Sequence, residues 1–433
     1  MAKVRLILVS LLLVALAACE RDGLDTTLNI GPYGEETRRV LLLYEAGYNS
    51  LGSDLKKNIN QLKQGYLPGN GRQDDVLLVF SHMTRSSNDF SVQTAPTLVR
   101  LYATLGEMQA DTLKVWPAGT PVANKEMVTE VFNLVRELFP AHGYGAVLAS
   151  HATGWLPEDY FSNPKRYEGE DRGGSSSSFY WSPRKKTFGQ EYYGDYAKQY
   201  NQEIELKDLA AAIPYKLDYL LFDACLMATV EVAWELRDVC GYLAFSPCEI
   251  PSAGFNYKTL AEHLLQPETP DLQAVCLDYY DQYVNDDTYG ATITMADCSA
   301  LDDLAAVCRT LFGRYRSGIL NLDGKNVQCY DRRVGSKHYN VFFDLKDIVR
   351  EAGATDGDLA ALQGALDKVV VFERHTPSFM IDYYGMNLDR VCGLSMYLPA
   401  YPDYKRDIYH GTEFLDGFYK QNIAWNQATG LVE

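Results

Sequence analysis

Two short apolar runs, each followed by a reactive side chain, constrain the fold of this chain more than any other feature. Residues 146–149 are apolar and precede His151, and residues 220–222 are apolar and precede Cys225. Such runs are typical of strands buried on both faces of a parallel sheet. In these sheets ligands bind beyond the carboxyl ends of the strands. We therefore expect His151 and Cys225 to meet at one edge of a sheet, where a Cys–His pair can supply a thiol nucleophile.

The rest of the chain alternates apolar strands with amphipathic helices. Residues 40–44 and 75–80 are predicted strands, and Asn124 is placed to cap a helix whose apolar residues recur at helical spacing. Residues 97–102 are expected to form an edge strand because Arg100 interrupts them. This alternation predicts an α/β fold of three layers, with a mostly parallel central sheet and helices on both faces.

The segment after the cysteine is predicted to be a helix over residues 227–236, starting next to the thiol. A helix N-terminus favours negative charge, so it would stabilise a thiolate at Cys225.

The chain starts with the layout of a secretory signal peptide over residues 1–18. Lys3 and Arg5 precede an apolar run that is too short to span a bilayer. The four residues that end at Cys19 resemble the bacterial lipobox, in which the cysteine is lipidated and becomes the mature N-terminus. The alternative is an ordinary signal peptide with a chance cysteine. Residues 19–36 are then expected to be a lipidated cysteine and a polar tether.

The formal net charge of −17 narrows the choice of partners. Nucleic acids and anionic membrane surfaces would repel such a chain, whereas basic peptides would be attracted to it.

The signal peptide and the lipobox-like residues together predict where the protein acts. We expect an exported protein that its lipid holds in the bacterial cell envelope, at the outer membrane or cell surface, and that acts as a monomer.

The sequence around the two reactive residues resembles the clostripain family of cysteine peptidases, which belongs to the clan of caspases, legumains and gingipains. The resemblance is carried by Asp-Ala-Cys-Leu-Met at residues 223–227, by the strand before it, by the His151 segment and by residues 393–399. It implies a caspase-like catalytic domain over residues 37–298 and a C-terminal α/β part over residues 299–433 packed on it. It also implies hydrolysis of peptide bonds through a thioester on Cys225, with His151 as proton donor and acceptor.

The resemblance further implies that the backbone N–H groups of Cys225 and of the residue after His151 hold the oxyanion. Relatives usually have Gly after the histidine, and this chain has Ala152. If that position required a positive φ, Ala152 would be strained. A catalytically impaired relative that binds peptides in the envelope therefore stays open as an alternative, as does a glycan-binding lipoprotein that uses its Tyr and Trp residues.

Cleavage after Arg or Lys, as in some family members, requires an acidic pocket for the basic side chain. Asp223 lies two residues before Cys225, on the same strand face, and Glu249 follows the next predicted strand. Both are candidates for the pocket. Either carboxylate could instead cap a helix or pair with a cation at the surface.

Residues 155–201 break the α/β pattern with a Gly-Gly-Ser-Ser-Ser-Ser stretch flanked by basic residues. The composition predicts a flexible loop. Related peptidases carry a loop here that is cut during activation, so this region is a candidate cleavage site; an insertion without function is the alternative.

The remaining cysteines do not point to a metal or a full disulfide framework. Besides Cys19 and Cys225 there are seven, with no Cys-x-x-Cys pair. We expect mostly buried free thiols, although one or two disulfides stay open. No cofactor is expected, and calcium, known in some relatives, has no Asp-x-Asp-x-Asp-Gly loop to bind it.

Overall fold

The computed structural model describes residues 37–71, 74–86, 89–157, 188–193, 200–286, 288–331, 340–380, 385–399 and 412–433. The predicted signal peptide, Cys19, the tether and most of the 155–201 loop lie outside these ranges.

A ten-stranded sheet forms the middle layer, and its five central strands are parallel. These are, in spatial order, β2 (Val76–Ser86), β1 (Thr37–Gly47), β6 (Ala141–Ala149), β9 (Leu217–Asp223) and β10 (Cys240–Phe245). The two apolar runs singled out in the sequence are the buried halves of β6 and β9. The predicted α/β fold with a mostly parallel centre is confirmed.

Antiparallel strands flank the parallel centre on both sides. β4 (Thr97–Thr104) and β5 (Glu107–Val115) follow β2, with β3 (Asp89–Gln93) also paired to β2, while β11 (Thr292–Asp297) and β13 (Val370–His375) follow β10. The prediction that residues 97–102 form an edge strand was wrong, because β5 pairs with β4 and lies outside it in the sheet. Arg100 is tolerated inside the sheet since its guanidinium lies 5.4 Å from the ring centroids of Tyr102 and Phe139.

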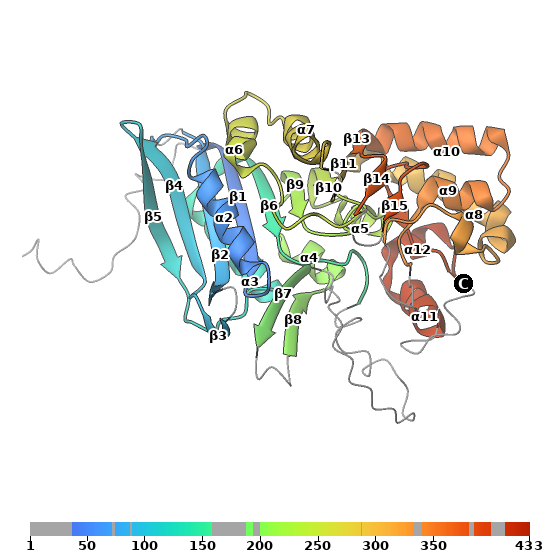
Figure 1. Ribbon diagram of the computed structural model, residues 1–433, viewed down its shortest axis with the longest axis horizontal. Helices are drawn as coiled ribbons and strands as arrows, with labels where there is room; N and C mark the ends of the chain where they lie inside the picture. Colours follow the sequence, from blue (N-terminus) through green and yellow to red (C-terminus); the bar gives the residue numbers. More distant parts are fainter. Residues whose placement is uncertain are drawn as a thin grey trace, which may run out of the picture.

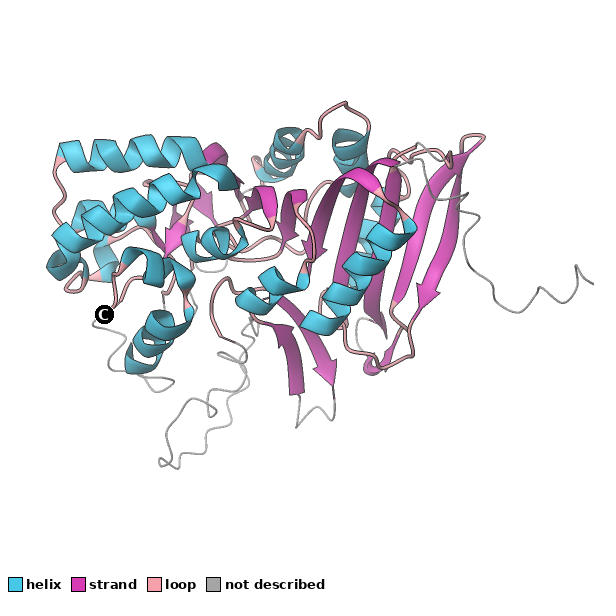
Figure 2. Ribbon diagram, turned by 180° about the vertical axis from the view of Figure 1, so that it is seen from behind, coloured by secondary structure: helices cyan, strands magenta, loops and turns pink. Residues whose placement is uncertain are grey.

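Helices cover both faces of the sheet (Figures 1 and 2). One face packs against α2 (Gly52–Leu62), α6 (Tyr257–Leu265) and α7 (Leu272–Tyr283), and the other against α3 (Lys125–Leu138), α4 (Leu206–Ala212) and α5 (Val230–Leu236). The predicted cap of α3 is confirmed, since the Asn124 side chain accepts a hydrogen bond of 2.8 Å from the Met127 N–H.

The C-terminal part extends the molecule beyond β10 and contributes β13 to the same sheet (Figure 1). Its helices are α8 (Leu301–Ile319), α9 (Leu345–Glu351), α10 (Asp356–Val369), α11 (Thr412–Asn422) and α12 (Ala424–Thr429). Short two-stranded pairs complete the fold: β7 (Phe188–Tyr193) with β8 (Tyr200–Ile204), β12 (Phe343–Asp344) with β16 (Ser395–Met396), and β14 (Ser378–Phe379) with β15 (Met386–Asn387).

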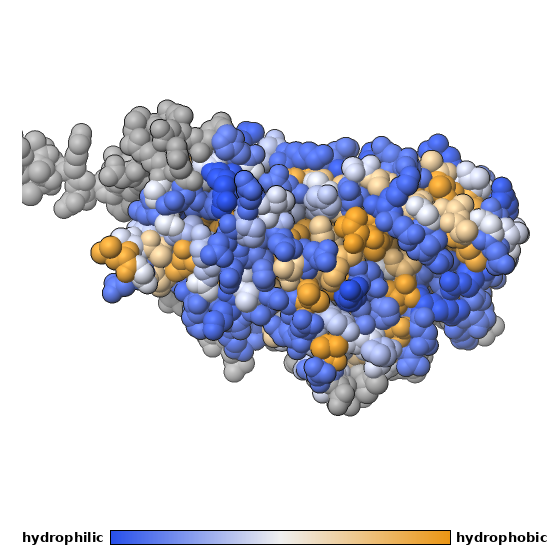
Figure 3. Space-filling view, turned by 90° about the horizontal axis from the view of Figure 1, so that it is seen from above, coloured by the Kyte–Doolittle hydropathy of each residue, from blue (hydrophilic) through white to orange (hydrophobic). Residues whose placement is uncertain are grey.

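The surface seen from the side of α6 and α7 is mostly hydrophilic, with apolar residues in small groups (Figure 3). Among the described residues, no helix combines the length and apolarity needed to cross a membrane. All eight cysteines in the described ranges are free thiols.

A buried carboxyl group joins the C-terminal part to the helix that follows Cys225. Glu231 in α5 accepts hydrogen bonds of 2.8 Å from the Tyr397 N–H and the Tyr419 hydroxyl. Burial raises the pKa of Glu231 from 4.5 to about 7, although these hydrogen bonds oppose the rise. The folded protein therefore holds a proton here that the unfolded chain releases at lower pH.

This linkage predicts a pH-dependent stability. Between pH 4.5 and about 7 the folded state binds more protons at Glu231 than the unfolded chain does, so this residue's contribution to stability falls as pH rises. Each unit of pKa difference is worth about 1.4 kcal/mol. Urea unfolding at several pH values measures the free energy of unfolding of the wild type and of Glu231→Gln. The stability of the variant relative to the wild type should increase as the pH rises toward 7. The exposed Glu107→Gln is the control, and parallel pH profiles for wild type and Glu231→Gln would contradict the prediction.

Candidate active site

The register of β6 and β9 brings the two reactive residues to the same level. Ala149 pairs with Asp223, so His151 and Cys225 each lie two residues beyond the paired ends of adjacent parallel strands. The Ser150 N–H donates to the Asp223 carbonyl at 3.4 Å, which continues the ladder past the strand. Neighbouring strands are about 4.8 Å apart, so both side chains leave the same edge of the sheet. The structure thus places the two predicted residues together.

The loop after β1 supports the His151 segment, and sequence reasoning did not identify it. The Ser50 hydroxyl lies 2.9 Å from His151 Nε2. Next to it, Asn49 hydrogen-bonds the Ala46 carbonyl at 2.9 Å and the Ser150 hydroxyl at 3.3 Å. These contacts orient the imidazole ring, as groups behind a reactive side chain commonly do. Only the local motif Tyr-Asn-Ser after a strand could have hinted at this role.

The environment of Cys225 differs from the prediction. Helix α5 begins at Val230, not beside the thiol, and its N-cap is Thr229. The intervening loop turns through Leu226, whose φ is +61°, and the Leu226 N–H donates to the Cys248 carbonyl at 2.9 Å. The helix is displaced because the Leu226 and Ala228 N–H groups instead donate to the Cys248 and Ser246 carbonyls of the segment after β10. The predicted stabilisation of a thiolate by the helix N-terminus was therefore wrong.

A different donor faces the sulfur. The Ile250 N–H lies 3.4 Å from Cys225 Sγ, and the Ile250 carbonyl lies 3.9 Å from it. An N–H group directed at sulfur favours the thiolate, while the carbonyl can accept from the thiol. Both groups belong to the loop after β10, so tertiary structure supplies what the local helix does not.

Ala152 adopts an ordinary backbone conformation. Among the described residues, the non-glycine residues with positive φ are Leu105, Leu226 and Met380, so Ala152 carries no strain of that kind. Ala152 pairs with Phe188 of β7, and the Gly189 N–H donates to the His151 carbonyl at 3.0 Å. In this type of antiparallel pair the N–H of Ala152 points away from β7. Alanine in place of glycine therefore imposes no backbone penalty at this position.

Asp223 is buried on the face of the sheet that α6 covers. Its Oδ2 accepts a hydrogen bond of 2.6 Å from the Tyr257 hydroxyl. Burial raises the pKa of Asp223 to about 6, against the opposing effect of the hydrogen bonds from Tyr257 and the Phe255 N–H. Within the described ranges Asp223 neither caps a helix nor forms an ion pair, and its role in a substrate pocket stays a prediction. Glu249 is half-buried and precedes Ile250 in the loop that faces the sulfur.

His82, which also follows an apolar run, has a different environment. Its ring is buried, with Nδ1 bonded to Glu191 of β7 and Nε2 2.7 Å from the Gln93 side chain. The second carboxylate oxygen of Glu191 accepts from the Val122 and Ala123 N–H groups at 2.7 and 3.1 Å. The His82–Glu191 pair fastens β7 to the body of the protein, and β7 in turn contacts the backbone of His151.

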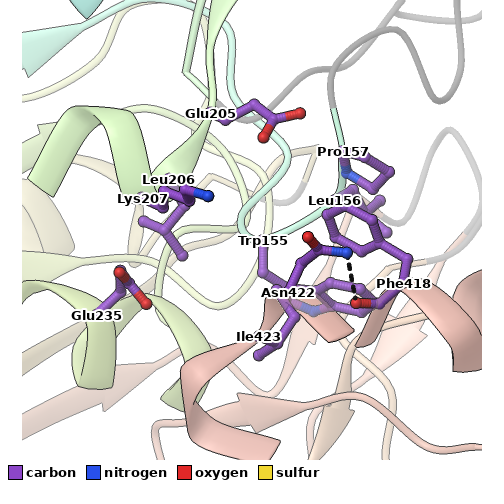
Figure 4. Close-up of a pocket in the computed structure, with 10 residues that line it drawn as sticks. All are labelled: Trp155, Leu156, Pro157, Glu205, Leu206, Lys207, Glu235, Phe418, Asn422 and Ile423. Atoms are coloured by element: carbon purple, nitrogen blue, oxygen red, sulfur yellow. Dashed lines mark hydrogen bonds between the residues drawn. The ribbon is translucent and has the colours of Figure 1, made fainter. Parts of the chain in front are cut away.

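A pocket beside the chain that follows the His151 segment lacks comparable chemistry (Figure 4). It lies between the chain after Gly154, the start of α4, and α11, where the Asn422 side chain donates to the Phe418 carbonyl of the same helix at 3.2 Å. Its lining contains no His or Cys: Trp155, Leu156, Pro157, Glu205, Leu206, Lys207, Glu235, Phe418, Asn422 and Ile423. In the described part of the chain no group of three or more potential metal ligands occurs.

Comparison with known proteins decides the family. The model of the clostripain family matches residues 181–429, more than half of the chain, including Asp223, Cys225 and Glu249; His151 precedes the match. The chain belongs to the clostripain family. The predicted class, a clostripain-type cysteine peptidase, is confirmed at this level.

Solved structures of similar proteins agree with the fold of this clostripain-family chain. An inactive zymogen C11 protease from Parabacteroides distasonis has a TM-score of 0.71 and 26% identity, covering 92% of this chain and 99% of that one. A secreted C11 cysteine protease from Bacteroides thetaiotaomicron, in complex with an irreversible peptide inhibitor, has a TM-score of 0.68 and 23% identity over 91% and 99% of the two chains. No curated protein matches the sequence.

The contacts of Glu191 predict that this residue positions the site. Glu191→Gln removes the carboxylate that His82 faces, so β7 should loosen and the His151 backbone should lose a fixed partner. We expect kcat for peptide hydrolysis to fall about tenfold or more with little change in KM, because small misplacements of a reacting group cost that much. Steady-state kinetics and a melting curve measure the two effects.

The double variant His82→Gln, Glu191→Gln is the matched control. Removing both members of a buried pair leaves no uncompensated charge, so it should be more stable than Glu191→Gln alone. A folded Glu191→Gln protein with wild-type kcat would refute the positioning role.

Proposed function

We propose that this chain is a cysteine endopeptidase that uses His151 and Cys225 as a catalytic dyad and cleaves after Arg or Lys. One observation carries the proposal: both residues lie two positions beyond paired ends of adjacent parallel strands, with the Ile250 N–H directed at the sulfur.

The proposed mechanism follows from these positions. Thiolate Cys225 attacks the scissile carbonyl and forms a thioester, while His151 takes up the thiol proton and delivers it to the leaving amine. The backbone N–H groups of Ala152 and Cys225 hold the oxyanion. Water then hydrolyses the thioester with His151 as the base, which regenerates the thiol. No cofactor enters these steps.

The preference for basic residues rests on charge. Asp223 is an acidic group two residues before the thiol that forms no ion pair in the described ranges, and Glu249 lies in the loop that faces the sulfur. A buried cation requires such a partner. The net charge of −17 also favours basic substrates over acidic ones. The crystallised relative that holds a peptide inhibitor is consistent with a polypeptide substrate.

Cleavage within residues 155–201 is proposed as the activating step. The Gly/Ser-rich stretch and its basic flanks are typical of protease-sensitive segments. One similar structure is an inactive zymogen, so a latent form is known among relatives. Residues 158–187 of this segment lie outside the described ranges; Gly154 lies shortly before them with a φ of +63°, and Phe188 follows them in a paired strand.

Export and lipid anchoring complete the proposal. The signal-peptide layout and the lipobox-like residues up to Cys19 support them, and one similar structure is a secreted protease. Residues 37–298 would then form the catalytic domain and residues 299–433 its C-terminal part, acting as a monomer on the cell envelope.

The proposed specificity predicts the outcome of a peptide panel. Fluorogenic peptides that differ only at the residue before the cut should be hydrolysed after Arg and Lys by the domain from Asp22 onward. Activity should be lost on Cys225→Ala and fall by several orders of magnitude on His151→Ala, since residues of one catalytic unit each remove most of the rate.

Each other result of this panel is informative. Hydrolysis after residues other than Arg and Lys would support the His151–Cys225 dyad but contradict the proposal that Asp223 and Glu249 form a pocket for basic side chains. Silence even after limited proteolysis of the 155–201 loop would favour a peptide-binding relative without catalysis. A fully active protein that remains a single uncut chain would remove the activation step.

Lipid anchoring predicts a modified N-terminus. In the native host, mass spectrometry of the mature protein should find a diacylglyceryl group on Cys19, and the protein should be in the membrane fraction and be released from it by detergent. The Cys19→Ser variant should be absent from the membrane fraction, because the acyl chains provide the attachment. An unmodified mature N-terminus at another residue would refute the anchor.

A further inference from the structure

Two cysteines away from the dyad have their sulfur atoms in contact. Cys240 is the first residue of β10 and Cys298 directly follows β11, and their Sγ atoms lie 3.8 Å apart. Cys240 is fully buried and Cys298 is 5% exposed, within the same apolar core. A disulfide bond is about 2.05 Å long, so the two sulfurs need to approach by about 1.8 Å to form one.

The sheet fixes the backbone at both cysteines. Strands β10 and β11 are antiparallel neighbours, and Tyr242 pairs with Asp297. Continued by one residue, this register sets Cys298 opposite Gly241, the residue next to Cys240. The spacings within and between such strands then put the two Cα atoms about 6 Å apart. This separation is common for disulfides, so a bond here requires side-chain rotation and no change of strand register.

The chain between the two cysteines carries groups that hold the candidate active site. It contains the loop whose Ile250 N–H lies 3.4 Å from Cys225 Sγ, and it contains α6, whose Tyr257 hydroxyl donates to Asp223. It also contains α7 and β11. A bond between residues 58 positions apart closes this whole segment into one covalent loop. Closing a long loop restricts the unfolded chain and so stabilises the folded state.

We propose that Cys240 and Cys298 form a disulfide bond when the chain folds under oxidising conditions, as in the exported protein. The inference rests on the proposed export, because disulfides persist in oxidising compartments and are rare in the cytosol. It does not depend on peptide hydrolysis. The arrangement with two free thiols in contact is then the reduced form.

The oxidant is another disulfide, carried by a thiol–disulfide oxidoreductase or by a small thiol such as glutathione. The thiolate of one cysteine attacks this disulfide, which forms a mixed disulfide and releases one thiol. The thiolate of the second cysteine then attacks the sulfur of the first and releases the other thiol. Two electrons pass from the cysteines to the oxidant, and the two cysteine protons end on the released thiols.

The bond forms while the chain folds and not afterwards. In the folded chain both thiols are buried, which keeps an oxidant away from them. The contact with Cys298 and burial also raise the pKa of the Cys240 thiol, and a neutral thiol does not attack a disulfide.

Peptide mapping of the protein isolated from the envelope of its host tests the pairing. Free thiols are blocked with N-ethylmaleimide in denaturant without reductant, and the protein is then cut with chymotrypsin. This protease releases Cys240 within residues 237–242 and Cys298 within residues 290–301, and neither peptide contains another cysteine. Mass spectrometry should find the two peptides linked, and reduction should separate them. Recovery of both cysteines as blocked thiols, or linked to other cysteines, would refute the proposal.

Urea unfolding with and without dithiothreitol measures the effect of the bond on stability. Reduction should lower the unfolding midpoint of the wild type by about 0.5 M or more. The double variant Cys240→Ala, Cys298→Ala should not respond to the reductant. The matched control is Cys276→Ala, Cys308→Ala, which also removes two buried thiols, but from cores on opposite faces of the sheet. It should respond as the wild type does, and a wild type that does not respond would contradict the stabilising role.

The mapping uses the wild type, so it decides the pairing even if a variant does not fold. If the protein is recovered only from the cytosol, the proposed export fails. The reduced full chain is then refolded in a mixture of oxidised and reduced glutathione: the same linked peptides would support the pairing, and free thiols in the folded chain would refute it. Neither result changes the evidence for the His151–Cys225 dyad, which the peptide panel tests separately.

Discussion

The parallel register of β1, β6 and β9 is the constraint on which the rest of the site depends. Glu45, Ala149 and Asp223 lie in one row across the three strands, and His151 and Cys225 lie one step beyond that row. Because parallel strands end at a common edge, residues more than seventy positions apart in the chain become neighbours without any local motif joining them. A shift of one residue in either strand would turn the acids and the thiol to the opposite face.

The same row marks a change from an apolar core to buried acids. Below it the face is lined by aliphatic side chains, which stabilise the sheet through burial. At the row itself, two carboxyl groups are buried; Asp223 accepts hydrogen bonds from the Tyr257 hydroxyl and the Phe255 N–H, and no partner is described for Glu45. Burial of this kind costs stability, and such costs concentrate at functional sites.

Loops distant in sequence complete what the strands begin. Residues 46–51 hold the His151 segment through Asn49 and Ser50, and the loop after β10 brings the Ile250 N–H to the sulfur. Strand β7 adds a third support, fastened by the buried His82–Glu191 pair. Each support comes from a different element, so no single stretch of sequence reveals it.

The apolar runs, the amphipathic helix capped at Asn124 and the residues around Cys225 were sufficient to predict the α/β fold and the family, and the strand pattern placed His151 and Cys225 at one edge of the sheet, because strand burial and helix capping are local patterns. The edge position of residues 97–102 and a helix starting beside Cys225 were wrong, since partners elsewhere in the chain decided both: β5 covers β4, and the segment after β10 pairs with residues 226–228. The contacts of Ser50 with His151 and of Ile250 with Cys225 were not predicted, because each joins segments that are distant in the sequence. The sequence by itself determined which residues could form buried strands and carry chemistry. Only the tertiary structure decided which of them face one another, because strand register and long-range hydrogen bonds depend on the packing of the whole chain.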